Sequence, residues 1–187
     1  MVWPPGSRRH PLARSVVSIG GEEKTVKTKD AHPVNPSSQD GVGDNTELMH
    51  LHEPALLHNL ACRYAQDEIY TYTGNILIAV NPFQRLPIYG EDVLFDYIGK
   101  SIGVMPPHVY AISDQALRKM KTSGVGQAII ISGESGAGKT ETAKVALEYL
   151  TSLSGGENNE ESLATKMMQS NPILEVRQRT SDLSQPF

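Results

Sequence analysis

A glycine-rich segment of eight residues constrains the fold of this chain more than any other feature. Residues 133–140 read GESGAGKT and fit the pattern Gly-x-x-x-x-Gly-Lys-Ser/Thr. The apolar run Ala128–Ile131 comes shortly before the segment, and Lys139–Leu150 has the character of a helix. A glycine-rich turn between a buried strand and a helix is the setting that a phosphate-binding loop requires. The sequence therefore predicts an α/β fold with this loop at a strand-to-helix junction.

Each residue type in the segment has a physical role in holding phosphate. Glycines let the backbone approach an anion without a Cβ clash, successive N–H groups form an anion nest, and the following helix adds its positive N-terminal end. Lys139 would place a charge near the β and γ phosphates, and Thr140 would offer a hydroxyl to Mg²⁺. We therefore predict that the nucleotide-binding residues are Gly133, Glu134, Ser135, Gly136, Ala137, Gly138, Lys139 and Thr140, with Thr140 also the magnesium ligand.

Two alternatives accompany this interpretation. A glycine-rich turn with a surface lysine would explain the same residues, but the bare pattern should arise by chance in only roughly 1 % of such chains. Glu134 and Glu141 flank the loop, and a general-base role is conceivable for either. The preference of carboxylates for helix N-termini favours a solvated or capping role instead.

Composition excludes several classes of function. The 187 residues carry a net charge of −4, which gives no support to nucleic-acid binding. No stretch approaches the roughly 20 apolar residues of a membrane span. Cys62 is the single cysteine, so no internal disulfide can form and a reducing compartment fits. It lies near His50, His52 and His58, but this spacing matches no zinc pattern, so we expect ordinary core and surface side chains.

Periodicity and turn residues predict the local elements. Ser15–Ile19 and Lys24–Lys27 could form a hairpin, and Ile69–Tyr72 and Ile76–Val80 form another around Thr73-Gly74-Asn75. The strand Ile76–Val80 is apolar on both faces, so we expect it inside a sheet. Thr46 should cap a first short helix, and Pro54 should begin a second one whose apolar face is Leu56, Leu57, Leu60 and Ala61. Further helices are expected at Glu91–Tyr97, Tyr110–Lys121 and Leu163–Gln169.

Five separated segments resemble the myosin motor domain, and they are most similar in character to unconventional, transport-type myosins. GESGAGKTE, with Gln127–Ser132 before it and Thr142–Leu150 after it, is the myosin form of the phosphate-binding loop. LHEPALLHNL at Leu51–Leu60 resembles the family's early helix, and IYTYTGNILIAVNPFQRL at Ile69–Leu86 resembles its first sheet strands. PPHVYAISD at Pro106–Asp114 and NPILE at Asn171–Glu175 match in the same order.

The resemblance implies a fold and an organisation. It implies a P-loop NTPase-type mixed sheet with flanking helices, incomplete here, and an N-terminal remnant of a small β-barrel around Glu22–Asn35. The expected domains are an N-terminal segment, 1–39, which is a partial barrel or disordered, the N-terminal part of a motor domain, 40–175, and a divergent polar tail, 176–187. Carried over by position, Asn81, Pro82 and Tyr89 match the family's adenine-side loop, with Arg85 a weaker candidate.

The function that the resemblance implies is that of an actin-based motor with Mg-ATPase activity, located in the cytoplasm on the cytoskeleton, with ATP and Mg²⁺ as ligands. Similarity ends at Glu175, before switch I, switch II and the actin-binding surface of the family. The alternative is therefore a truncated, non-catalytic fragment that binds nucleotide. A different P-loop enzyme, such as a small kinase, is disfavoured because the ordered motifs point elsewhere. No catalytic residue is assigned, because phosphoryl transfer also needs groups that position water around the γ-phosphate.

Overall fold

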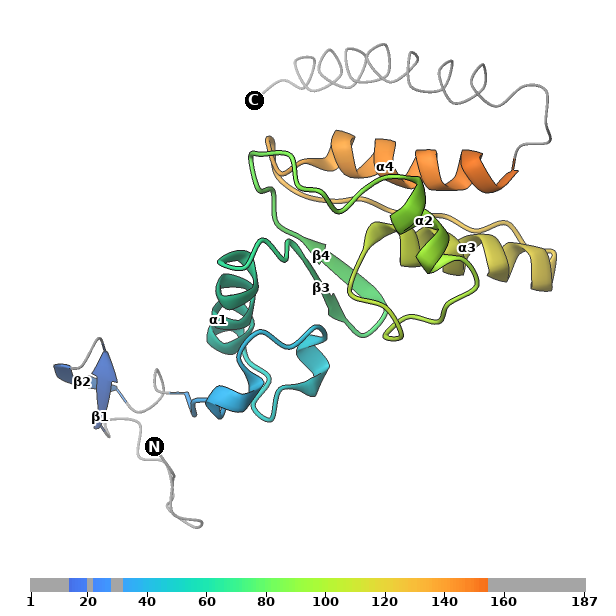
Figure 1. Ribbon diagram of the computed structural model, residues 1–187. Coiled ribbons are helices and arrows are strands. Elements are labelled where there is room, and N and C mark those ends of the chain that lie inside the picture. Colours follow the sequence, from blue (N-terminus) through green and yellow to red (C-terminus); the bar gives the residue numbers. More distant parts are fainter. Residues whose placement is uncertain (1–13, 20–21, 28–31, 155–187) are drawn as a thin grey trace, which may run out of the picture. The chain divides into compact units, whose positions relative to one another are not determined.

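A computed structural model of the chain describes residues 14–19, 22–27 and 32–154. The chain divides into two compact units, Met1–Ala79 and Val80–Phe187. Figure 1 labels the helices and strands of both. The expected helix at Leu163–Gln169 and the expected polar tail, 176–187, lie outside the described residues. None of the helices in the described part is long and apolar enough to cross a membrane.

The first unit begins with the hairpin of β1 (Arg14–Ile19) and β2 (Glu22–Lys27). The two strands are antiparallel, with Arg14 opposite Lys27 and Ile19 opposite Glu22. This confirms the hairpin that the sequence predicts at these positions. They form a two-stranded sheet of their own.

A second hairpin joins β3 (Tyr70–Thr73) to β4 (Ile76–Ala79) through the two residues Gly74 and Asn75. Gly74 has a φ of 60°, which glycine adopts without steric cost in a tight hairpin turn. The predicted hairpin is confirmed, but the expected burial of its second strand is wrong. The sheet has only two strands in the described part of the chain, and the Ile76 side chain is 66 % exposed.

Between the hairpins lie two short 3-10 helices, η2 (Ser37–Gln39) and η3 (Asn45–Glu47), and the helix α1 (Glu53–Tyr64). The expected cap of η3 is wrong by two positions: the Asp44 carboxylate accepts from the Thr46 backbone N–H and hydroxyl. Helix α1 has Pro54 in its first turn, as predicted, and the His52 ring accepts from the Ala55 N–H.

Helix α1 buries a face that hydrophobic periodicity does not predict. Its buried residues are Ala55, Asn59 and Arg63, whereas Leu57 is 60 % exposed. Asn59 donates to the Val42 carbonyl at 2.9 Å. The expected leucine face is therefore wrong in part: Leu57 is exposed, whereas Leu56 and Leu60 are half-buried beside the buried polar residues. Hydrogen bonding to neighbouring backbone helps to decide which side of the helix faces inward.

The second unit contains α2 (Glu91–Tyr97), α3 (Val109–Ser123) and α4 (Lys139–Ser154), which confirms three of the predicted helices within a few residues. Helix α3 ends at Gly124, whose left-handed conformation is the usual C-terminal stop. Helices α3 and α4 pack together through Tyr110 and Tyr149, which are fully buried with ring centroids 5.2 Å apart.

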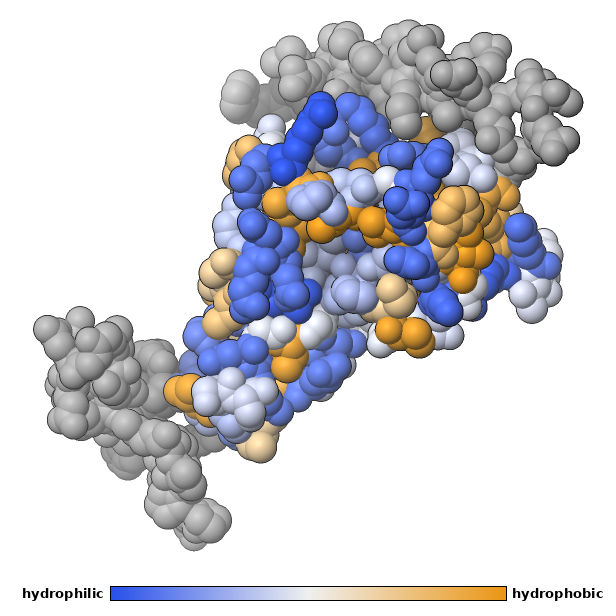
Figure 2. All heavy atoms as spheres, viewed as in Figure 1, coloured by the Kyte–Doolittle hydropathy of each residue, from blue (hydrophilic) through white to orange (hydrophobic). Residues whose placement is uncertain are grey.

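The apolar run before the glycine-rich loop is not a strand. Residues 124–138 have no assigned strand, and no described segment pairs with Ala128–Ile131. Ile130 is 89 % exposed, so the expectation of a buried strand is wrong. The described residues contain two separate antiparallel hairpins and helices, but not the mixed sheet that the sequence predicts. Figure 2 shows apolar side chains at the surface among hydrophilic ones.

Candidate functional site

The glycine-rich loop leads directly into α4, as its motif requires (Figure 1). Gly136 and Gly138 have φ values of 79° and 91°, which residues with a Cβ rarely adopt. The Ala137 N–H donates to the Glu134 carbonyl at 3.2 Å and so closes a turn within the loop. The Thr142 N–H donates to the Gly138 carbonyl at 2.9 Å and starts the helix. The loop therefore presents a helix N-terminus behind a tight glycine turn.

Lys139 folds back over this loop. Its Nζ donates to the carbonyl oxygens of Gly133 and Glu134, both at 2.8 Å. The ammonium group is thus held above the loop by two neutral acceptors. Hydrogen bonds from an ammonium group to an anion are stronger than those to neutral carbonyls, so an anion would compete well for this donor.

Asn81 lies against the glycine-rich loop although 55 residues separate it from its partner. Its Nδ2 donates to the Gly136 carbonyl at 2.8 Å, and its Oδ1 accepts from the Phe83 N–H at 2.9 Å. A Cβ placed on Gly138 would lie 3.7 Å from the Asn81 side chain. The structure therefore brings Asn81 together with the loop. The segment that carries Asn81 and the loop lie side by side in Figure 1.

The other expected residues of the adenine side lie along the same connection to α2. Pro82 follows Asn81 and is half-buried, whereas Arg85 is exposed. The Tyr89 ring packs near His108, with centroids 5.5 Å apart, and near Tyr110 at 6.5 Å. These contacts place Tyr89 against an aromatic cluster. Contact of Pro82 and Tyr89 with nucleotide stays a prediction.

The flanking carboxylates have the surroundings of solvated groups. The Glu141 carboxylate is 2.7 Å from the Lys144 ammonium in an ion pair within α4, and its side chain is 75 % exposed. Glu134 is exposed and contacts Lys139 through its backbone carbonyl. This arrangement favours the solvated interpretation of both side chains over the general-base one.

His108, which precedes α3, is a buried titratable group whose ring packs against Tyr89. The ring is 3 % exposed and lies within 4.4 to 5.5 Å of the rings of Tyr110, Tyr97 and Tyr89. Burial lowers the pKa of His108 to about 4, while a hydrogen bond with the Ile88 backbone acts weakly in the opposite direction. The ring is neutral at pH 7, so its Nδ1 can accept from the Tyr110 N–H at 3.0 Å.

A second group missed by sequence reasoning holds α4 against α3. The Tyr149 hydroxyl donates to Asp114 Oδ1 at 3.1 Å, and Arg118 Nε donates to Asp114 Oδ2 at 2.6 Å. Burial, followed by the Asp114 charge and its hydrogen bond, raises the pKa of Tyr149. The i,i+4 spacing of Asp114 and Arg118 could have predicted their ion pair from the sequence. No local pattern predicts that Tyr149, 35 residues away, donates to Asp114.

The loop, the Lys139 side chain and the Asn81 amide lie together at the turn that leads into α4. The glycine conformations, a helix N-terminus and an ammonium donor are the components that a phosphate group requires. Thr140 lies half-buried in the first turn of α4 and offers the hydroxyl that suits a hard cation such as Mg²⁺. The residues present therefore fit a metal-bound polyphosphate.

Comparison with known proteins places most of the chain in one family. The family model for the myosin head (motor domain) matches residues 42–178. Myosin-7 of Arabidopsis thaliana is 48 % identical over 163 residues, covering 86 % of this chain and 9 % of the relative. Myosin-3 of the same plant is 49 % identical over 161 residues, covering 86 % and 13 %. Unconventional myosin-VI of Bos taurus is 42 % identical over 188 residues, covering 94 % and 14 %. The chain thus spans a small part of the length of these relatives.

Proposed function

The chain belongs to the myosin motor-domain family, and we propose that residues 133–140 bind the phosphates of ATP as part of an actin-based motor. The observation that carries this proposal is the joint placement of Lys139 and Asn81 on the glycine-rich loop. Two chain segments far apart in sequence meet at one anion-binding turn. The P-loop NTPase-type fold that the resemblance implies is part of the same proposal for the whole motor.

Lys139 makes the largest contribution to binding. Its ammonium group exchanges the two carbonyl acceptors, Gly133 and Glu134, for the β and γ phosphates. The exchange is favourable because the new acceptor is charged and the helix N-terminus favours negative charge at the same place. Backbone N–H groups of the loop supply the remaining donors, with Gly136 and Gly138 permitting the close approach.

Thr140 would hold the cation that accompanies the nucleotide. A bound Mg²⁺ would neutralise part of the phosphate charge. The Thr140 hydroxyl would supply one of its oxygen ligands from the first turn of α4. Glu134, Ser135 and Ala137 complete the loop around the phosphates.

Asn81, Pro82 and Tyr89 contact the adenine side in this proposal. Asn81 also fixes the loop through its bond to the Gly136 carbonyl. The proposed motor portion is 40–175, flanked by 1–39 and 176–187. Cytoskeletal location and binding to actin follow from the family and belong to the proposal for the whole motor.

We assign nucleotide binding to these residues and no step of hydrolysis. The loop supplies positive charge and backbone donors, whereas phosphoryl transfer to water also needs a group that orients the attacking water. The alternative function, a non-catalytic nucleotide-binding fragment, is favoured for the 187-residue chain in isolation. Robust actin-activated release of phosphate by this chain, absent from its Lys139→Ala variant, would overturn that alternative.

The test is an isothermal calorimetric titration of the 187-residue chain with ATP, carried out with and without Mg²⁺. We expect saturable binding with one site, weakened at least about tenfold by Lys139→Ala, because two or more charge-assisted hydrogen bonds are lost. Lys144→Ala is the matched control, since Lys144 lies on the same helix and pairs with Glu141 at the surface. Its affinity should stay within about twofold, as expected for an exposed ion pair.

Two further measurements separate the parts of the proposal. Thr140→Val should weaken binding in the presence of Mg²⁺ and have little effect without it. Asn81→Ala should weaken binding under both conditions, because it releases the loop from its bond to this side chain. Equal affinities of wild type and Lys139→Ala would refute the proposal.

A further inference from the structure

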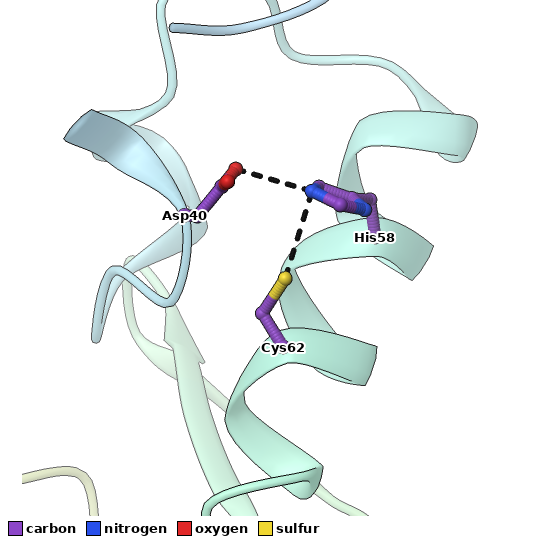
Figure 3. A group of neighbouring side chains, drawn as sticks. All are labelled: Asp40, His58 and Cys62. Atoms are coloured by element: carbon purple, nitrogen blue, oxygen red, sulfur yellow. Dashed lines mark hydrogen bonds and ion pairs between the residues drawn. The ribbon is translucent and has the colours of Figure 1, made fainter. Parts of the chain in front are cut away.

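Three possible metal ligands converge where η2 meets α1 in the first unit (Figure 3). Asp40 is the C-terminal cap of η2, and His58 and Cys62 lie one turn apart on α1. His58 Nε2 is 3.1 Å from Asp40 Oδ1 and 3.5 Å from Cys62 Sγ. All three ligand atoms lie within 4.8 Å of one another. The three residues form the Asp-His-Cys cluster.

The geometry of the ring nitrogen argues against a catalytic triad. In a triad the nucleophile and the orienting carboxylate contact opposite nitrogens of the imidazole. Here Asp40 and Cys62 both approach Nε2 of His58. A proton on Nε2 can be donated to Asp40, but the nitrogen then has no lone pair for the Cys62 thiol. Without that proton, Nε2 directs its lone pair toward the carboxylate.

A cation resolves this conflict because all three groups can then donate lone pairs to one point. In a tetrahedral zinc site with bonds of roughly 2.0–2.3 Å, neighbouring ligand atoms are separated by roughly 3.3–3.6 Å. The observed separations of 3.1 and 3.5 Å from Nε2 are close to these values. The side chains of Asp40 and His58 are 40 % and 61 % exposed, so an ion can reach them. Small side-chain rotations can bring the Asp40 oxygen and the Cys62 sulfur to the remaining ligand-to-ligand separation.

We propose that the Asp-His-Cys cluster is a binding site for a zinc-class divalent cation with three protein ligands and a position left for water. One thiolate, one imidazole and one carboxylate form a set that suits Zn²⁺ and Co²⁺ better than Mg²⁺ or Ca²⁺, which prefer oxygen alone. The ion joins the segment around Asp40 to α1. The site lies in the first unit and does not involve the glycine-rich loop of the second.

The cluster also refines the expectation for the histidines around Cys62. His52 caps α1 through Nδ1, and its Nε2 is 2.9 Å from the Pro33 carbonyl oxygen, so this ring has a structural role. His58 and Cys62 join Asp40, which comes from a different element 18 residues earlier. The usual sequence spacings of zinc ligands do not include a His-x-x-x-Cys pair on a helix together with a distant aspartate. The ligand set is therefore visible only in three dimensions.

The test is a titration of the 187-residue chain with Co²⁺ in the absence of nucleotide. Binding is monitored by the charge-transfer absorption band between the Cys62 thiolate and the bound Co²⁺. Cys62 is the single cysteine, so any such band reports on this site alone. We expect one equivalent of Co²⁺ to saturate the band and one equivalent of Zn²⁺ to remove it. Cys62→Ser should abolish the band.

The decisive variants are Asp40→Asn and His58→Gln, which keep Cys62. Each should weaken Co²⁺ binding by about tenfold or more, since loss of even an outer-sphere partner of a metal ligand commonly costs 10- to 100-fold. Glu53→Gln and His50→Gln are the matched controls, because they alter a carboxylate and an imidazole outside the cluster. Far-UV circular dichroism checks that each variant keeps its helices.

Unchanged affinity in both Asp40→Asn and His58→Gln would show binding to the thiol alone and would overturn the proposal. Absence of a saturable band in the wild type would overturn it as well. A reduction confined to the cluster variants, with the control variants unaffected, supports the three-ligand site. ATP binding is measured separately, so failure of this proposal leaves the proposed function untouched.

Discussion

Acidification from pH 7 to pH 5 should destabilise the second unit through His108. The ring is 3 % exposed and packs against Tyr97 and Tyr110, with centroids 5.1 and 4.4 Å away. Its Nδ1 accepts the Tyr110 N–H at the start of α3. Protonation would place a charge among aromatic rings and remove this acceptor, so the folded state resists it.

The size of this loss of stability follows from the difference between the pKa of His108 in the unfolded chain and its pKa in the folded chain. Burial lowers the pKa of His108 from 6.5 to about 4 in the folded chain. As the pH falls below 6.5, the unfolded chain takes up a proton that the folded chain does not, so the free energy of unfolding decreases. At pH 5 this linkage amounts to about 2 kcal/mol relative to neutral pH, and above pH 7 it vanishes.

The assay is urea unfolding at half-unit steps between pH 5 and pH 8, for wild type and His108→Asn. Asparagine is a good N-terminal cap and does not titrate, so it keeps the acceptor for the Tyr110 N–H. The variant loses packing volume and is less stable at pH 7. The difference between the two curves cancels other titrating groups, and it should shrink by about 2 kcal/mol from pH 7 to pH 5.

A difference between the curves that stays constant across this range would refute the reasoning. It would mean that His108 titrates equally in both states, which contradicts a ring held neutral by burial. A difference that grows with acidification would also refute it, because the folded state would then bind the proton more tightly than the unfolded chain.

Three further outcomes test the second unit and its site. Tyr149→Phe should lower the free energy of unfolding by about 1.5–3 kcal/mol, because the buried hydroxyl donates to the Asp114 carboxylate. Urea unfolding measures this loss, with Tyr64→Phe at an exposed tyrosine as the control. An equal loss of unfolding free energy in the two variants would contradict the prediction. Gly138→Ala should cost about 1–2 kcal/mol from its φ of 91° and weaken ATP binding, whereas unchanged affinity would show that the loop tolerates a Cβ. Amides of Ala128–Ile131 should exchange faster than those paired in β3 and β4, and strong protection in the run would show that a sheet forms around it.

Elements whose signals are local could be predicted from the sequence. Gly74 and Asn75 fix the turn between β3 and β4, and Pro54 marks the start of α1. The glycine-rich loop also carries its whole signal in eight consecutive residues. By contrast, the bond from Asn81 to the Gly136 carbonyl spans 55 residues and could be anticipated only through the resemblance to a family.

The failed predictions concern segments whose partners lie elsewhere in the chain. The run Ala128–Ile131 has the apolar, β-branched character of a buried strand, yet burial needs neighbouring strands that the run itself cannot specify. Likewise, Ile76–Ala79 is apolar on both faces but pairs with β3 alone in the described part of the chain. Apolar character indicates a tendency toward burial, and the number of neighbours decides whether it is realised.

Helix α1 shows why a polar face can be the inward one. Arg63 is 6 % exposed, and its guanidinium donates to the carbonyls of Tyr70 and Gly41 at 2.7 and 3.0 Å. These acceptors lie in β3 and in the segment before η3. An apolar side chain of similar size would fill the space but could not donate to them, so these hydrogen bonds from the guanidinium would be lost. Leu57 therefore lies on the exposed side, with Leu56 and Leu60 half-buried beside the polar face, because that face supplies donors to backbone carbonyls of the first unit.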